Sequence, residues 1–252
     1  MKEYILECCV DSVESAINAA KGGASRLELC SNLIIGGTTP DVALVKEIRK
    51  YSDIRIHALI RPRFGDFCYT EYEMEIMKSQ IRALKEAGVE GVVIGVLDAD
   101  GNLDISKMKE LLQNAEGMSV TLHRAFDMCR DPFQALEEAI LLGIHTILTS
   151  GQKASAWEGR KLLCQLMEQA DGRIDIMAGA GINASVIEKL IPITKGSSYH
   201  MSGKITLDSK MKYRKADVSM GLPSLSEYEI WQTSEEAVRE AVQVLEQVEL
   251  EV

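Results

Sequence analysis

Two short apolar segments near the start of the chain each carry a carboxylate followed two residues later by a cysteine. They are Leu6-Glu7-Cys8-Cys9 and Leu27-Glu28-Leu29-Cys30. Residues two apart on a strand face the same side of a sheet. The segment between them, 12–23, has a helical pattern, and a strand–helix–strand unit is a parallel crossover whose strands tend to be neighbours. The spacing therefore predicts that two thiols and two carboxylates converge.

The two thiols allow two interpretations. Thiolates of Cys9 and Cys30 on neighbouring strands could hold a soft ion such as Cu(I). Zn²⁺ would need further ligands, which His123 or a glutamate could supply. Alternatively, both are free cysteines that pack as small hydrophobic side chains, and spacing alone favours this second interpretation.

Polar side chains also alternate along the later predicted strands. The pattern places nine side chains inside the barrel or at its rim: Glu7, Cys9, Glu28, Cys30, His57, Arg61, His123, Asp127 and His200. Buried charges need partners, so one interpretation is a structural ion-pair network in which Arg61 and Arg63 serve the two glutamates.

The same residues could instead form an active site. Arg61 and Arg63 would bind an anion through their planar guanidinium groups. Glu7 or Glu28 would exchange protons with His123, as general acid–base catalysis requires, and Asp127 is a further candidate for a catalytic role.

Glycine-rich turns follow the last two predicted strands. Gly179-Ala180-Gly181 precedes a helix that begins at Asn183, and Ser202-Gly203 follows strand eight. In many α/β barrels, backbone N–H groups of these two loops bind a phosphate. Gly179, Gly181 and Ser202 are therefore candidates for a phosphate site, although any loop between a strand and a helix can use glycine to turn.

Eight strand segments alternate with helical segments along the whole chain. The strands are expected at 6–10, 27–30, 54–62, 91–96, 119–126, 146–150, 174–178 and 197–200, and helices are expected at 12–23, 71–87, 104–113, 131–143, 155–170, 183–190 and 233–248. Alternating strands and helices imply a parallel sheet. Eight strands in this alternation, over 252 residues, predict a closed (β/α)₈ TIM barrel forming one domain over 1–252, with an open doubly wound sheet as the alternative.

The predicted barrel contains one insertion, at about 204–232, between strand eight and the last helix. It is expected to be a long connection without regular structure, which is often functional. Its first half is basic, with Lys204, Lys210, Lys212, Arg214 and Lys215. This segment would lie near the loops after strands seven and eight and would favour an anionic ligand there.

Composition excludes several classes of partner. The net charge of −10 argues against nucleic acid or an anionic membrane surface as a partner. No apolar run approaches the roughly 18 residues of a membrane span. The N-terminus lacks the pattern of a secretory signal, so a cytoplasmic protein is expected, with its six cysteines reduced.

The motifs at the predicted strand ends resemble those of the CutC family of copper homeostasis proteins. The matching stretches are 7–12, 26–33, 36–40, 60–69, 123–127, 148–152 and 179–183. The resemblance implies a TIM barrel, a cytoplasmic location, self-association as a dimer or tetramer, and Cu(I) bound by Cys9 and Cys30. It implies no organic cofactor.

Three functions therefore stay open from sequence. The first is Cu(I) binding in copper homeostasis, which takes its weight from the resemblance. The second is a barrel enzyme acting on a small phosphorylated or carboxylated metabolite by acid–base chemistry. The third is a barrel that acts through protein contacts.

Overall fold

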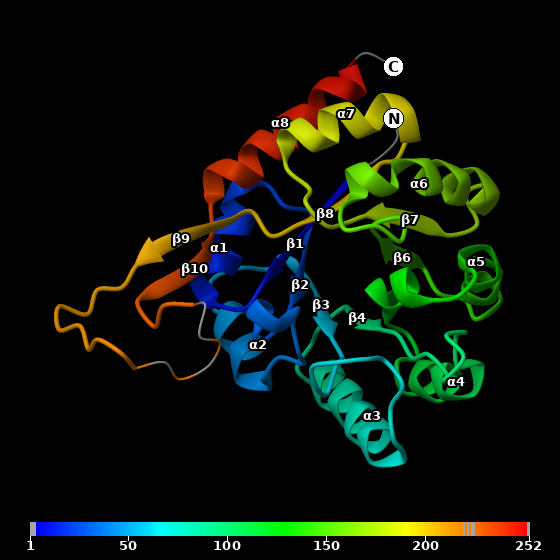
Figure 1. Cartoon of the computed structure of the whole chain (residues 1–252), viewed down its shortest axis with the longest axis horizontal. Coiled ribbons are helices and arrows are strands. Elements are labelled where there is room, and N and C mark those ends of the chain that lie inside the picture. The colour runs from blue at the N-terminus through cyan, green and yellow to red at the C-terminus, as the bar shows by residue number, and fades with distance from the viewer. Residues whose placement is uncertain (1–3, 219, 221, 223–224, 251–252) are drawn as a thin grey trace.

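Eight parallel strands close into a barrel in chain order, as the alternating pattern predicts. The structure is a computed structural model that describes residues 4–218, 220, 222 and 225–250 (Figure 1). The barrel strands are β1 (Ile5–Val10), β2 (Arg26–Leu29), β3 (Arg55–Leu59), β4 (Gly91–Ile94), β5 (Ser119–Leu122), β6 (Thr146–Thr149), β7 (Asp175–Ala178) and β8 (Ser198–Met201).

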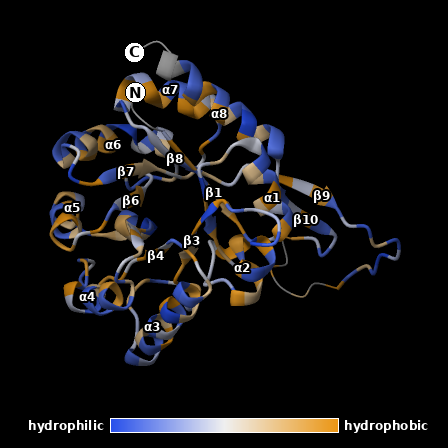
Figure 2. Cartoon of the chain, turned by 180° about the vertical axis from the view of Figure 1, so that it is seen from behind, coloured by the Kyte–Doolittle hydropathy of each residue, from blue (hydrophilic) through white to orange (hydrophobic). Residues whose placement is uncertain are grey.

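Helices surround the barrel and cover its outer face. They are α1 (Val13–Gly22), α2 (Val42–Ile48), α3 (Glu71–Glu86), α4 (Ile105–Asn114), α5 (Pro132–Leu141), α6 (Ala156–Ala170), α7 (Ala184–Thr194) and α8 (Glu235–Leu250). Many begin at a residue whose side chain accepts a backbone N–H, such as Ser12, Thr70 and Asn183. Hydrophobic and hydrophilic colours alternate along the helices in Figure 2, as amphipathic helices require.

Alternate residues of the strands supply the core between the barrel and the helices. On β1, Leu6, Cys8 and Val10 are fully buried in this core, so their intervening neighbours Glu7 and Cys9 face the barrel interior. The strand period of two therefore sorts apolar side chains outward, against the helices, and the reactive side chains inward.

Several elements differ from their sequence-based bounds: β3 ends at Leu59 and β4 at Ile94, and α2 (Val42–Ile48) lies where no helix was predicted. Strand β5 ends at Leu122, and a short 3₁₀ helix, η2 (Arg124–Met128), follows because the His123 side chain accepts the Ala125 N–H and turns the chain. Helix α7 continues to Thr194 and takes Pro192 into its last turn. The loop after β2 contains a further 3₁₀ turn, η1 (Leu33–Ile35).

The insertion at 204–232 was expected to lack regular structure. It instead contains an antiparallel strand pair. Strands β9 (Lys204–Asp208) and β10 (Glu229–Thr233) pair with each other outside the barrel. Apolar and polar residues alternate along β9, as is typical of a strand. The hairpin projects from the barrel beside α1 (Figure 1), and the Asn18 side chain donates to the Thr233 carbonyl at 2.9 Å.

Candidate functional site

The register of β1 against its two neighbours decides which inward side chains meet. Cys9 lies opposite Glu28 on β2, while Glu7 lies opposite Arg26 on β2 and opposite His200 on β8. Three adjacent strands therefore bring a thiol, two carboxylates, a guanidinium and an imidazole to one sector of the barrel interior.

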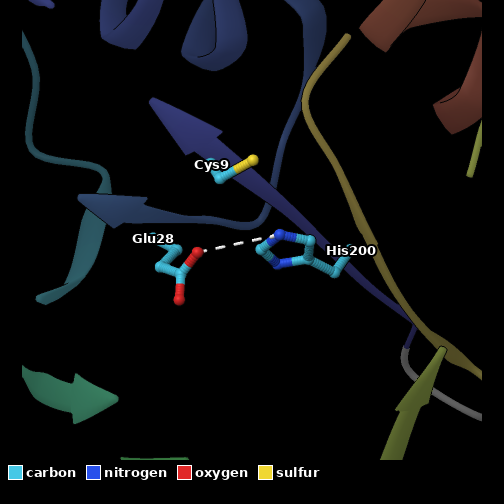
Figure 3. Close-up of side chains that lie close together, drawn as sticks. All are labelled: Cys9, Glu28 and His200. Atoms are coloured by element: carbon cyan, nitrogen blue, oxygen red, sulfur yellow. Dashed lines mark ion pairs between the residues drawn. The ribbon is translucent and has the colours of Figure 1, made fainter. Parts of the chain in front are cut away.

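Cys9, Glu28 and His200 form a compact group in this sector. One ligand atom from each residue lies within 4.8 Å of the other two. His200 Nε2 is 3.7 Å from Glu28 Oε2, and the Cys9 thiol lies beside this pair in Figure 3. Among the residues that the structure describes, this is the group of three with the geometry to hold a metal ion.

Glu7 connects this group to a buried cation. Its carboxylate accepts from Arg26 Nε at 2.5 Å and lies 2.8 Å from His200 Nδ1. Burial alone would raise the pKa of Glu7, but the Arg26 charge and the hydrogen bond with His200 together hold it well below its usual value. Glu7 is therefore an anion that fixes the orientation of the His200 ring.

Glu28 and His200, the two ionisable partners of Cys9 in this group, also have shifted pKa values. Burial, followed by the Glu7 charge, raises the pKa of Glu28, although His200 opposes this shift. Burial disfavours the charged form of His200, but Cys9, Glu7 and Glu28 raise its pKa well above the ordinary value. Without a bound ion, His200 therefore carries a proton at neutral pH.

Cys30 lies outside this group of three. It follows β2, two residues beyond the position opposite Cys9, and its thiol is buried against Leu59 and Val93. Burial, together with the nearby Glu28 and Cys9, raises the pKa of Cys30 well above its ordinary value. The Cys30 thiol is therefore held in its neutral form.

A large cavity opens over these residues at the carboxyl ends of the strands, where α/β barrels place their active sites. Its volume is about 1110 Å³, and its walls include Cys9, Glu28, Arg61, His123, Asp127 and His200. Six of the nine side chains expected inside the barrel or at its rim therefore line this cavity, and Glu7, Cys30 and His57 are not among its lining residues.

Arg61 and His123 occupy another part of the same cavity wall. The Arg61 guanidinium donates to the carbonyls of Ile35, Gly37 and Gly65. Arg61 and His123 are both buried. Arg61 therefore does not serve Glu7 or Glu28, because Arg26 from β2 takes the place that the ion-pair interpretation gave it.

Arg63 and Asp127 organise loops. Arg63 Nε lies 2.5 Å from Glu73, and Arg63 Nη2 lies 2.8 Å from Asp66, so its guanidinium is committed to the loop after β3. Asp127 accepts from the Thr149 and Ser150 hydroxyls, and from backbone N–H groups after β6. Neither arrangement leaves the charged group unpaired for a ligand.

The glycine turn after β7 has a packing role. A side chain at Gly179 would meet Leu148 at 2.5 Å, and Gly181 has a φ of +74° that L-residues rarely adopt. Gly181 and Ser202 line the cavity. The Gly179 N–H donates to the Thr149 carbonyl, so Gly179 cannot offer it to a phosphate.

Sequence reasoning missed Arg26 as the partner of Glu7 and did not assign His200 a role at the metal site. The signal for Arg26 is its parity with Glu28, two residues away on β2. The signal for His200 is that it lies on strand eight. In a closed barrel this strand pairs with β1, which places His200 opposite Glu7.

The sequence matches the family model described as the CutC family over residues 4–205. This chain belongs to the CutC family. The CutC family protein of Vibrio campbellii is 45% identical over 242 residues, covering 95% of this chain and 98% of its own. A human relative named copper homeostasis protein cutC homolog is 44% identical, covering 94% of this chain and 87% of its own.

A solved structure agrees with this assignment. The putative copper homeostasis protein CutC from Streptococcus agalactiae has a TM-score of 0.76 and 30% identity, over 79% of this chain and 98% of that chain. The family match ends at residue 205, so most of the β9–β10 hairpin lies beyond it. Across the described residues, we find no helix with the length and apolar character to cross a membrane.

Proposed function

We propose that the chain binds Cu(I) at the mouth of its barrel, with the Cys9 thiolate and the His200 imidazole as ligands and Glu28 beside them. The observation that carries this proposal is the approach of ligand atoms from these three residues to within 4.8 Å of one another. Thiolate and imidazole are ligands suited to copper. The name of the human relative, a copper homeostasis protein, supports copper over other soft ions.

The contacts behind His200 support its role as a ligand. Metal-binding histidines usually donate their second ring N–H to a carboxylate, which fixes the tautomer and the ring orientation. Glu7 takes this position on Nδ1, 2.8 Å away, and Arg26 holds Glu7 in turn. Nε2 is then the nitrogen that faces Glu28 and the incoming ion.

Cys30 and the cell compartment belong to the same proposal. The family resemblance predicts Cys30 as a second copper ligand. Burial, together with the nearby Glu28 and Cys9, disfavours its thiolate form. We therefore consider Cys30 a weaker candidate ligand than His200. A cytoplasmic location would keep the thiols reduced and available to Cu(I). Self-association as a dimer or tetramer stays a prediction.

An anaerobic Cu(I) titration against a colorimetric chelator tests this proposal. We expect one equivalent to bind tightly to the parent chain, and both Cys9→Ser and His200→Gln to weaken binding by at least tenfold. Cys30→Ser tests the second thiol. Cys164→Ser is the matched control, because the Cys164 thiol contacts the Ile193 carbonyl on the outer helices and does not line the cavity. Equal binding by the parent chain and Cys9→Ser would refute the site.

A second candidate function is that of an enzyme acting on a small phosphorylated or carboxylated metabolite. The cavity of about 1110 Å³ favours it, since pockets of this order hold small molecules rather than single ions. Burial lowers the pKa of His123 to about 3, which makes it a poor proton carrier at neutral pH. Glu28 and His200, whose side chains lie 3.7 Å apart, are the alternative acid–base pair. Screening phosphorylated metabolites for thermal stabilisation and then for turnover tests this function, which fails if none stabilises the chain.

A further inference from the structure

Two buried N–H groups in the cavity wall have no hydrogen-bond partner among the described residues. They are the Nε of Arg61 and the Nε2 of His123. Their residues are 7% and 5% exposed, and both line the large cavity. A buried donor without a partner carries a desolvation cost, and this cost is removed when a ligand accepts the hydrogen bond.

The tautomer of His123 can be read from its other nitrogen. Nδ1 accepts the Ala125 backbone N–H at 3.1 Å and therefore carries no proton. Burial, together with the Arg61 charge, lowers the pKa of His123 to about 3, so the ring is neutral at physiological pH. A neutral imidazole with an unprotonated Nδ1 must carry its proton on Nε2. His123 thus carries a fixed, uncharged donor that is buried in the cavity wall.

Arg61 supplies a positive charge that its protein contacts do not neutralise. Its two Nη groups donate to backbone carbonyls of the loops after β2 and β3. These contacts hold the guanidinium rigidly but are to neutral groups. A buried cation held only by neutral acceptors favours an anion as the partner of its remaining N–H.

The Phe67 ring packs against both residues. Its centroid is 4.9 Å from that of the His123 ring and 5.2 Å from Arg61 Cζ. Gly95 makes room for the imidazole, since a Cβ there would lie 2.6 Å from His123 Cε1. The positions of both donors are therefore set by packing before any ligand arrives.

We propose that Arg61 and His123 form a subsite that binds the oxyanion of a small carboxylate or phosphate monoester. Its oxygens accept hydrogen bonds from Arg61 Nε and His123 Nε2, and the guanidinium balances its charge. Arg63, which the sequence also suggested for an anion, takes no part because Glu73 and Asp66 occupy it. The subsite depends neither on bound copper nor on catalysis.

Calorimetric titration of the full chain with inorganic phosphate and with succinate tests the subsite. Chloride at matched ionic strength controls for screening, and a chelator keeps the protein free of metal. We expect His123→Phe to weaken binding about tenfold or more, as loss of a hydrogen bond to a charged group does. Arg61→Lys, which removes Nε–H and keeps the charge, should also weaken it. His145→Phe is the matched control, because His145 Nδ1 likewise accepts a backbone N–H, that of Val120, outside the cavity.

Binding of either anion that is weakened by His123→Phe and by Arg61→Lys, but not by His145→Phe, supports the subsite. The two titrations also tell which oxyanion it prefers. Absence of binding at millimolar concentrations, or equal binding by the parent chain and His123→Phe, overturns it. If either variant fails to fold, the ¹⁵N resonance of His123 Nε2 in the parent chain decides, since a bound anion must shift it. Cys9→Ser should bind the anion normally, so failure of the copper site and failure of this subsite are distinguishable.

Discussion

The buried pair between Arg26 and Glu7 offers the sharpest prediction of stability. Arg26→Met removes the cation from a carboxylate that is fully buried, and the side chains are 7% and 1% exposed, so solvent screening is slight. Removing one partner of a buried ion pair costs about 3–5 kcal/mol. Because His200 still contacts Glu7 at 2.8 Å, we expect the lower end, about 3 kcal/mol.

Equilibrium urea unfolding at neutral pH measures this loss. Arg26→Met/Glu7→Gln should recover much of the stability, because it leaves no unpaired buried charge. Arg239→Met is the control, since Arg239 pairs with Glu235 and Glu236 on an exposed face of α8 and should cost less than about 1 kcal/mol. A loss for Arg26→Met as small as for Arg239→Met would refute the assignment of Arg26 as the structural partner of Glu7.

Three further perturbations have defined outcomes. The pKa of His200 is raised in the folded chain. The protonated ring therefore contributes its full stabilisation below the unfolded pKa of about 6.5, and this contribution declines as the pH rises toward the folded pKa. Over that range, the difference in unfolding free energy between the parent chain and His200→Gln should shrink. Gly91→Ala would place a Cβ 2.5 Å from His57 Cδ2 and should cost about 1–3 kcal/mol in urea unfolding. Gly95→Ala would displace His123, so phosphate binding should weaken about tenfold; unchanged binding would contradict the subsite.

The fold could be predicted from sequence because its signals are local. The alternation of Glu7 and Cys9 with Leu6 and Cys8 fixes the inner face of β1, and repetition of strand and helix units implies closure. The hairpin of β9 and β10 was not predicted, since its strands pair across 20 residues of connection and bury little.

The membership of the candidate site could be predicted only in part. Strand parity selects the inward residues, but the register decides which of them touch, and register depends on packing around the whole barrel. Thus Cys9 meets Glu28 and His200, and Arg26 reaches Glu7. Arg61 instead donates to loop carbonyls whose positions depend on the backbone of η1 and the loop after β3, which periodicity does not reveal.

X-ray absorption at the copper edge tests the central claim most directly. The parent chain, loaded anaerobically with one equivalent of Cu(I), should show one sulfur ligand and at least one nitrogen or oxygen ligand, and the outer-shell scattering of an imidazole ring should disappear in His200→Gln. Two sulfur ligands in both proteins would contradict the account and assign the ion to Cys9 and Cys30 instead.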